Sequence, residues 1–402
     1  MSCRGWSCPS SRKFPHGHGA YGPAHCRSLA VNSSTILEVV SPVSRTLQID
    51  RIMLFLKVVV MGEYSTEAAA SGDVRVATAD DVKWRCFVGA LTIVSLAPMA
   101  MFPLLGTAPP NGTAPFYAMF ALFALSSNFH VGATGWFFTD REMRAHFAAN
   151  PARYIVAPVL TIAATTSLFA VGNELIRNAV VAGGYAWLLW HYQKQNIGIL
   201  SFVCAGTDRL PPSVWERRTL ILAAIAGIVW LQCGITPGLP PSLTETVRMP
   251  VVGLSMLLPA IVTLALAIRS QPGLLRNPLR IGTLLYGLLF FLPALFFPVW
   301  SVGPFGAAHG LQYVVFMFCV SSRSAASIPS ILAMLSTAGL GFLLLDPHVR
   351  VREWLGVLDS PWFLGLVVGV VMSHFIVDAG IWRLREPSQR GYMRRKFDFV
   401  FR

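Results

Sequence analysis

The chain has 402 residues, of which 54% are hydrophobic and only 13% are charged, and its formal net charge is +13. An ordinary soluble domain carries roughly a quarter charged residues. A soluble fold of this length could not hide so much apolar surface, so the composition argues against that class and indicates an integral membrane protein.

The first 60 residues differ from the rest of the chain. Segment 1–60 has no sustained apolar period, and its charged start does not lead into the apolar run of a signal peptide. We expect 1–60 to be a disordered extension, with Met61 as an alternative start of translation before a polar cytoplasmic lead over 61–85. An alternative is a metal-binding tail, although its spacings fit no zinc template; its members would be Cys3, Cys8, His16, His18 and Cys26.

About ten apolar windows follow, each close to the ~20 residues that cross a hydrocarbon core. Because strands of a membrane barrel would alternate in hydropathy and these runs do not, all are predicted to be helices. The seventh and eighth windows touch, and their split near Pro298 follows from the helix-breaking prolines and glycines around it. The windows are 86–106, 115–138, 154–172, 177–203, 219–236, 250–268, 281–297, 298–320, 328–345 and 360–383. The predicted fold is an all-α, polytopic membrane bundle of about ten helices over 86–383.

Lys and Arg in short loops favour the cytoplasmic side of a membrane. Alternate connections hold most of them: Lys83, Arg85, Arg141, Arg144, Arg153, Arg209, Arg217, Arg218, Arg269, Arg276, Arg280 and Arg323. The basic tail 384–402 belongs to the same set, and its alternating basic and aromatic residues are typical of an interfacial anchor. The other loops hold few basic residues, namely Arg177 and Arg248, and the pair Arg350 and Arg352 is the one real departure from the rule. Both termini are therefore predicted to be cytoplasmic, in a bacterial-type inner membrane.

The positive charge has a simple explanation in these loops and the tail. It reflects topology and attraction to anionic membrane lipids, and we do not expect a nucleic-acid partner.

The loop after the second window contains Asp140, which can cap a short helix that Asn150 ends before Pro151. His146 in that helix is a further candidate ligand.

Four histidines, His130, His191, His309 and His374, lie singly in four different apolar windows. An ionisable side chain at membrane depth is costly and is by default a candidate for function. All four lie in even-numbered windows, which run in the same direction, and each is about 17 to 22 Å from the outer end at helical rise. If they form one site, their rings should approach one another, with Asp378 close to His374.

Each histidine also has polar residues on its own helical face. These stripes should face inward, because lipid would leave the polar groups unpaired. They are Thr134 after His130, Lys194 and Gln195 after His191, Gln312 and Tyr313 after His309, and Asp378 after His374.

Neutral imidazole binds Fe, Cu or Zn, and a carboxylate one turn away can be a ligand or fix the imidazole tautomer. We therefore predict His130, His191, His309 and His374 as metal ligands, with iron the first choice. Imidazoles from several helices also hold haem iron in membrane proteins, so haem is an alternative cofactor.

Asp378, Gln195 and Gln312 are the predicted catalytic residues, with Asp378 as ligand or orienter and the two glutamines as hydrogen-bonding partners. The expected function is metal-dependent oxidation of a lipophilic substrate that arrives from the bilayer. One alternative is a proton-coupled transporter that uses the same side chains as a proton relay. The other is a structural hydrogen-bond network between helices.

The loop charges make the topology testable. A reporter fused after Arg402 should be active only in its cytoplasmic form, because an even number of spans returns the chain to the side of its N-terminus. A periplasmic signal would mean an odd number of spans and would contradict the shared depth of the histidines.

Overall fold

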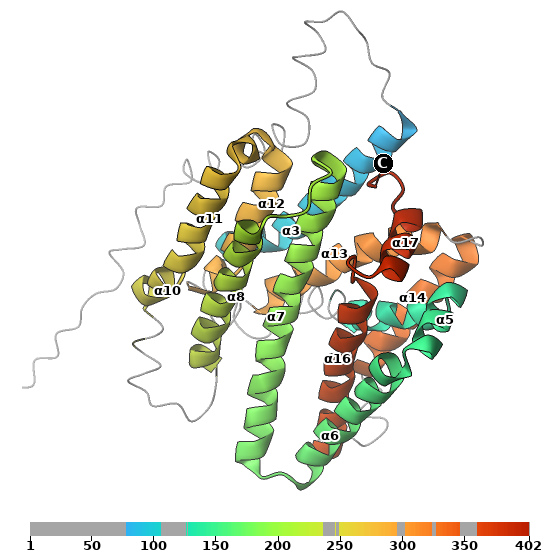
Figure 1. Cartoon of the computed structure of the whole chain (residues 1–402). Coiled ribbons are helices and arrows are strands. Elements are labelled where there is room, and N and C mark those ends of the chain that lie inside the picture. Colours follow the sequence, from blue (N-terminus) through green and yellow to red (C-terminus); the bar gives the residue numbers. More distant parts are fainter. Residues whose placement is uncertain are drawn as a thin grey trace, which may run out of the picture. The chain divides into compact units, whose positions relative to one another are not determined.

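A computed structural model of the protein describes residues 78–105, 126, 128–235, 246, 249–295, 302–323, 327–345 and 360–401. Every regular element in these ranges is a helix, as Figure 1 shows, and the all-α class is confirmed for them. The predictions for 1–60, for Met61 and for a Cys and His tail lie outside the described residues.

The first half of the described chain contains five longer helices and the short turns between them. These elements are α3 (Ala79–Leu105), a helical segment over 128–134, η2 (Gly135–Phe138), α5 (Arg141–Ala149), η3 (Ala152–Val156), α6 (Ala157–Val171), α7 (Glu174–Thr207) and α8 (Val214–Ile235). The second half contains α10 (Pro250–Met256), α11 (Leu258–Ser270), η4 (Pro272–Arg276), α12 (Pro278–Leu289), η5 (Leu292–Leu295), α13 (Val302–Ser322), α14 (Ser327–Leu345), α16 (Pro361–Ile381) and α17 (Pro387–Lys396).

Five stretches of helix in the described residues are long and apolar enough to cross a membrane. They are Asp80–Ala100, Ala152–Val171, Val251–Ser270, Gly303–Ser322 and Pro361–Ile381. Shorter apolar helices cover Pro278–Leu289 and Ile328–Gly339, within or beside the predicted windows 281–297 and 328–345. The chain thus has the apolar helices of a multi-pass membrane protein.

Prolines shift some helix boundaries away from the predicted ones. Helix α12 ends at Leu289, well before the predicted end at 297, and only a 3-10 turn that contains Pro293 follows. Pro158 has no N–H for a normal helical bond, and the turn before it is a π-helix in which Ala157 bonds back to Ala152. Hydropathy alone marks the apolar run and does not show where the hydrogen bonding changes.

Helix α13 is the most enclosed of the five candidate spans. Of its apolar window 67% is buried, against 17% for Ala152–Val171. It packs against α3, α7 and α14. Helices α6 and α11 instead expose large apolar side chains, including Val159, Leu160, Ile261 and Val262. Such faces suit contact with lipid chains, because no hydrogen-bonding group has to be left unpaired there.

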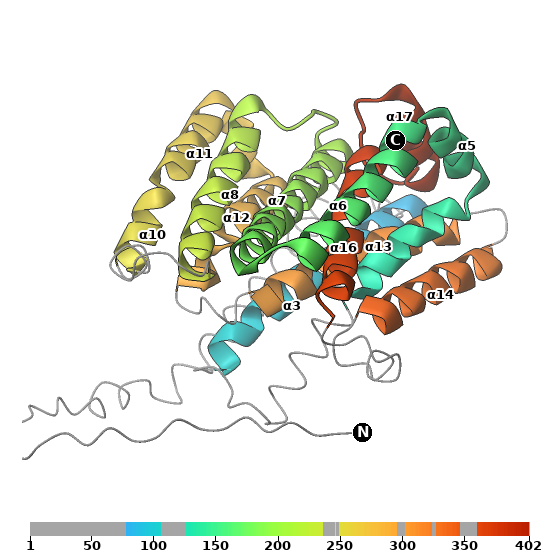
Figure 2. The ribbon, with the colours of Figure 1, turned by 90° about the horizontal axis from the view of Figure 1, so that it is seen from below.

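Helix α16 is held closely against α6, and the two lie side by side in Figures 1 and 2. A Cβ atom on Gly369 would lie 2.3 Å from Thr165 Oγ1 and 2.7 Å from Ile162 Cα, so only glycine permits this approach. Gly365, one turn earlier, is equally close to the α6 backbone. Small residues four apart allow membrane helices to pack this tightly. This contact fixes the helix that carries His374.

Charged residues join α7, α8 and α12 at one end. Arg280, only 3% exposed, donates two hydrogen bonds of 2.7 Å to Glu216 and one of 2.6 Å to Asp208. From the sequence alone, Arg280 belongs to the loop charges that indicate the cytoplasmic side of the membrane. Its charge is in fact paired inside the protein, so it is better regarded as part of a structural ion-pair network.

The C-terminal tail is part of the helical core. Phe397 lies against Phe87, Phe202 and Phe316, with ring centroids 5.8, 5.1 and 5.7 Å apart. The prediction that the aromatic residues of this tail anchor it at the membrane interface is wrong for Phe397, because that ring is fully buried. The spacing of the aromatic residues in the tail is compatible with burial against helix ends as well as with a membrane interface.

The glycine contact between α16 and α6 can be tested directly. Gly369→Ala should lower the stability of the detergent-solubilised protein by about 1–3 kcal/mol, because the added methyl forces the helices apart. Gly183→Ala is the matched control, since a Cβ on this α7 glycine meets nothing within 4 Å. Thermal unfolding measures both. Equal melting temperatures for the two variants would contradict the close packing.

Candidate metal centre

The four predicted histidines meet at one place inside the bundle. His130 lies in the helical segment 128–134, His191 in α7, His309 in α13 and His374 in α16. The Nε2 atom of His130 is 3.0 Å from Nε2 of His374 and 3.3 Å from Nε2 of His309. The His191 ring centroid is 4.8 Å from that of His309 and 5.2 Å from that of His374. Histidines far apart in the sequence thus form a single cluster.

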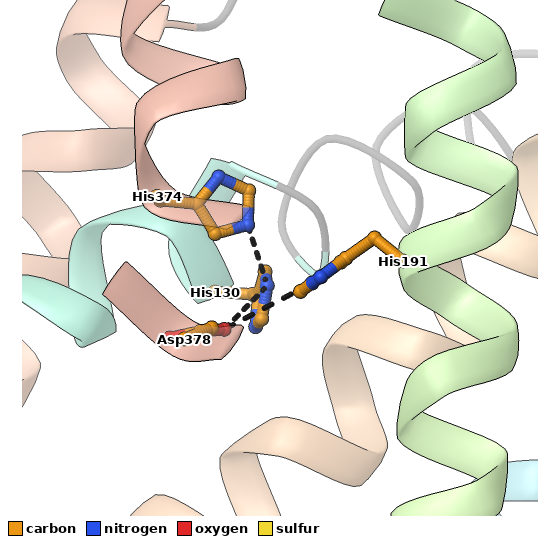
Figure 3. A group of neighbouring side chains, drawn as sticks. All are labelled: His130, His191, His374 and Asp378. Carbon is orange, nitrogen blue, oxygen red and sulfur yellow. Dashed lines mark hydrogen bonds and ion pairs between the residues drawn. The ribbon is translucent and has the colours of Figure 1, made fainter. Parts of the chain in front are cut away.

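Asp378 completes this cluster from the same helix as His374, one turn later. Its Oδ2 atom is 3.8 Å from Nε2 of His191 and 4.0 Å from Nε2 of His130. One donor atom from each of His130, His191, His374 and Asp378 lies within 4.8 Å of the other three, and Figure 3 shows these side chains pointing toward one another. His309 stands beside this set through its contact with His130.

The separations suit a common metal ion. First-row metals bind nitrogen and oxygen ligands at about 2.0–2.2 Å, so neighbouring ligands in tetrahedral or octahedral geometry stand about 2.8–3.6 Å apart. The 3.0 and 3.3 Å distances between imidazole nitrogens fall in this range, whereas Asp378 Oδ2 is farther from the imidazoles of His191 and His130, at 3.8 and 4.0 Å. The His191 Nε2 atom is buried and has no hydrogen-bond partner among the described residues. These features fit a site in which nitrogen lone pairs point at a cation.

Two hydroxyl groups contact the other oxygen of Asp378. The hydroxyl of Tyr313 donates to Oδ1 at 3.0 Å, and that of Thr134 donates to it at 3.2 Å. The Tyr313 ring also stands edge-on to His130, with centroids 4.0 Å apart. Both residues belong to the polar stripes seen in the sequence, and both lie next to the cluster.

The two predicted glutamines bond to each other, and Gln195 also contacts the backbone of His309. Gln195 Nε2 donates to the backbone carbonyl of His309 and to Oε1 of Gln312, both at 2.8 Å. Gln312 in turn donates to Ser95 Oγ at 2.8 Å. The amides therefore position helix α13 rather than touch an imidazole, and their catalytic role stays a prediction.

Aromatic rings cover two of the imidazoles. Phe375 stacks on His191 with centroids 4.4 Å apart, and Tyr192 lies over His309 at 4.3 Å. The sequence could not identify either aromatic residue as part of the site, because each only follows a histidine in an apolar run: Tyr192 follows His191, and Phe375 follows His374. Such walls keep water from the cluster and strengthen electrostatic interactions within it.

Two ionisable candidates lie elsewhere. Lys194 is exposed, with its amine over the Trp190 ring at 5.7 Å, so its inclusion in the inward stripe is wrong. His146 pairs with Tyr154 and Gln389 instead of joining the cluster, and burial lowers the pKa of its imidazole. Asp140 caps helix α5 as expected, since its side chain accepts from the Met143 N–H at 3.0 Å.

No protein-family model, curated protein or solved structure matches this chain. The chemistry of the centre is therefore defined by its own donors. Imidazole and carboxylate without thiolate suit Fe, Zn, Cu or Ni more than soft-metal clusters. A buried group of three histidines and one aspartate, with a fourth histidine beside it, can hold one such ion.

Proposed function

We propose that the protein is a multi-pass membrane metalloprotein in which one iron ion is bound by His130, His191, His309, His374 and Asp378. The observation that carries the proposal is the convergence of His130, His191, His374 and Asp378 on one buried point, with His309 in contact with His130 beside them. Isolated ionisable groups in an apolar interior are costly, and a shared cation offsets that cost for all of them.

The donor set suits iron, the ion expected from the sequence, and it also fits Zn, Cu or Ni. If His309 also binds, four nitrogens and one carboxylate oxygen would hold the ion, and a six-coordinate ion would keep one position for an external ligand. No described cysteine is part of the cluster, so the soft ligands that select Cu(I) or iron–sulfur centres are lacking there. An open position is what a catalytic site requires and a purely structural site does not.

The reaction we propose is oxidation of a lipophilic substrate. When bound, a redox metal supplies oxygen activation or electron acceptance. The protein supplies the ligands, the aromatic walls around His191 and His309, and a hydrogen-bonded support through Gln195 and Gln312. Apolar exposed faces on helices such as α6 and α11 support access from the bilayer.

The membrane arrangement proposed with this function has about ten spans and both termini in the cytoplasm of a bacterial-type cell. Five candidate spans and the loop charges support it. A partner other than lipid and substrate is not required by any feature of the site.

A proton-coupled transporter is the second candidate. The observation that favours it is that Nδ1 of His130 and Nδ1 of His309 are buried without a hydrogen-bond partner among the described residues. Ring nitrogens of bound histidines usually donate to an outer acceptor, whereas a relay needs nitrogens that can take up and release protons. Such a protein would fold and function without metal.

Haem is less compatible with the spacing. Two axial imidazoles on haem iron stand about 4 Å apart, at twice the Fe–N bond length, with the macrocycle between them. His130 instead meets His374 and His309 at 3.0 and 3.3 Å, and these rings pack edge to face.

Metal analysis of the purified protein tests the proposal. The wild-type chain should retain close to one equivalent of iron, and its optical spectrum should lack the haem Soret band. Replacement of His130, His191 or His374 by Ala should reduce the iron content at least tenfold, because each removes a direct ligand.

His146→Ala is the matched control, since this histidine is partly buried and pairs with Tyr154 away from the cluster. Its iron content should equal that of wild type. A metal-free wild-type protein that folds and moves protons would instead support the transporter. Equal iron loss in the control and the cluster variants would mean that binding depends on general packing.

A further inference from the structure

The two oxygens of Asp378 have different surroundings. Oδ1 accepts hydrogen bonds from the hydroxyls of Tyr313 and Thr134, at 3.0 and 3.2 Å. Oδ2 instead faces Nε2 of His191 at 3.8 Å and Nε2 of His130 at 4.0 Å. The carboxylate thus presents one oxygen to hydroxyl groups and the other to the imidazoles, the side visible in Figure 3.

As an oxygen of an ionised carboxylate, Oδ1 carries no hydrogen and can only accept in its contacts with the two hydroxyls. The Thr134 and Tyr313 oxygens also lie 2.9 Å from each other, so three short contacts share two hydroxyl hydrogens. Both hydroxyls can donate to Oδ1, or one can donate to the other, which then donates to Oδ1. The Thr134 hydroxyl also has a longer contact of 3.5 Å with the backbone carbonyl of His130. All three residues are at most 3% exposed, so these contacts are shielded from bulk solvent.

These contacts join three elements at the cluster. Thr134 ends the helical segment that carries His130, Tyr313 lies on α13, one turn after His309, and Asp378 lies on α16. Tyr313 has a second effect, because its ring stands edge-on to His130 and limits how that imidazole can turn. Residues that hold ligands in this way set the orientation and basicity of a metal site.

We propose that Thr134 and Tyr313 are positioning residues that make Asp378 a monodentate ligand, bound through Oδ2 alone. This inference rests on the proposed metal centre. A carboxylate can bind with one oxygen or with both, and one that is free to rotate would take two coordination positions. Hydroxyls fixed on Oδ1 keep the second position open for an external ligand, so they determine whether the centre can accept a substrate.

The experiment compares hydroxyl-deleting variants of the full-length protein, loaded with Co²⁺ as a spectroscopic probe for the divalent ion. Thr134→Val and Tyr313→Phe keep the shape of each side chain and remove only its hydroxyl. Each should weaken Co²⁺ binding by about 10–100-fold in a chelator competition. The visible absorption of bound Co²⁺ should also become weaker, because a bidentate Asp378 raises the coordination number. Thr134→Ser restores a hydroxyl and should return both measurements toward wild type.

The controls remove hydroxyls that lie outside the cluster. Thr337 donates to the Met334 carbonyl on α14, and Tyr154 pairs with His146. Thr337→Val and Tyr154→Phe should therefore keep the wild-type Co²⁺ affinity and spectrum.

Three results would overturn the inference, and each has a different consequence for the proposed metal centre. Unchanged affinity and spectrum in Thr134→Val and Tyr313→Phe would refute the positioning role while the metal centre stands. Weaker binding with an unchanged spectrum, no rescue by Thr134→Ser and a lower melting temperature of the metal-free protein would assign a packing role instead. A wild-type protein that binds neither iron nor Co²⁺ would refute the proposed function itself.

Discussion

The structure depends on how polar and ionisable side chains are satisfied inside an apolar helical bundle. Each imidazole or carboxylate left alone there would cost several kcal/mol, on the order of a large part of the net stability of a domain. The cluster avoids that cost by bringing these groups to one another. Arg280 follows the same rule at one end of the bundle, where Glu216 and Asp208 surround it. The need to pair buried polar groups therefore determines both how the helices pack and which side chains form the site.

Helix packing supplies the precision that the cluster needs. Gly369 lets α16 approach the α6 backbone, and this places His374 and Asp378 together on one side of the site. Gly132 allows an equally close approach of the segment carrying His130 to α14, where a Cβ would lie 2.4 Å from a backbone carbonyl. On the opposite side, Gln195 ties α7 to the α13 backbone. The ligands are thus held by contacts between backbones, which move less than side chains do.

The helical class and the members of the cluster could be predicted from the sequence, since apolar run length and the cost of a buried ionisable group are local signals. Asp378 was predictable because it lies one helical turn after His374, on the same face of the helix. Other features depend on packing between distant segments. Spacing could not tell that Lys194 points outward, that Phe397 is a core residue, or that Arg280 is paired inside the protein. Ser95 carries no signal at all, because a serine in an apolar helix usually bonds to its own backbone.

The central claim is that several imidazoles and one carboxylate bind the same metal ion, and X-ray absorption at the metal edge of the purified protein tests it most directly. We expect a first shell of nitrogen and oxygen at about 2.0–2.2 Å, with the outer-shell scattering of three or four imidazole rings. A first shell with no imidazole scattering behind it, or with sulfur ligands, would contradict it.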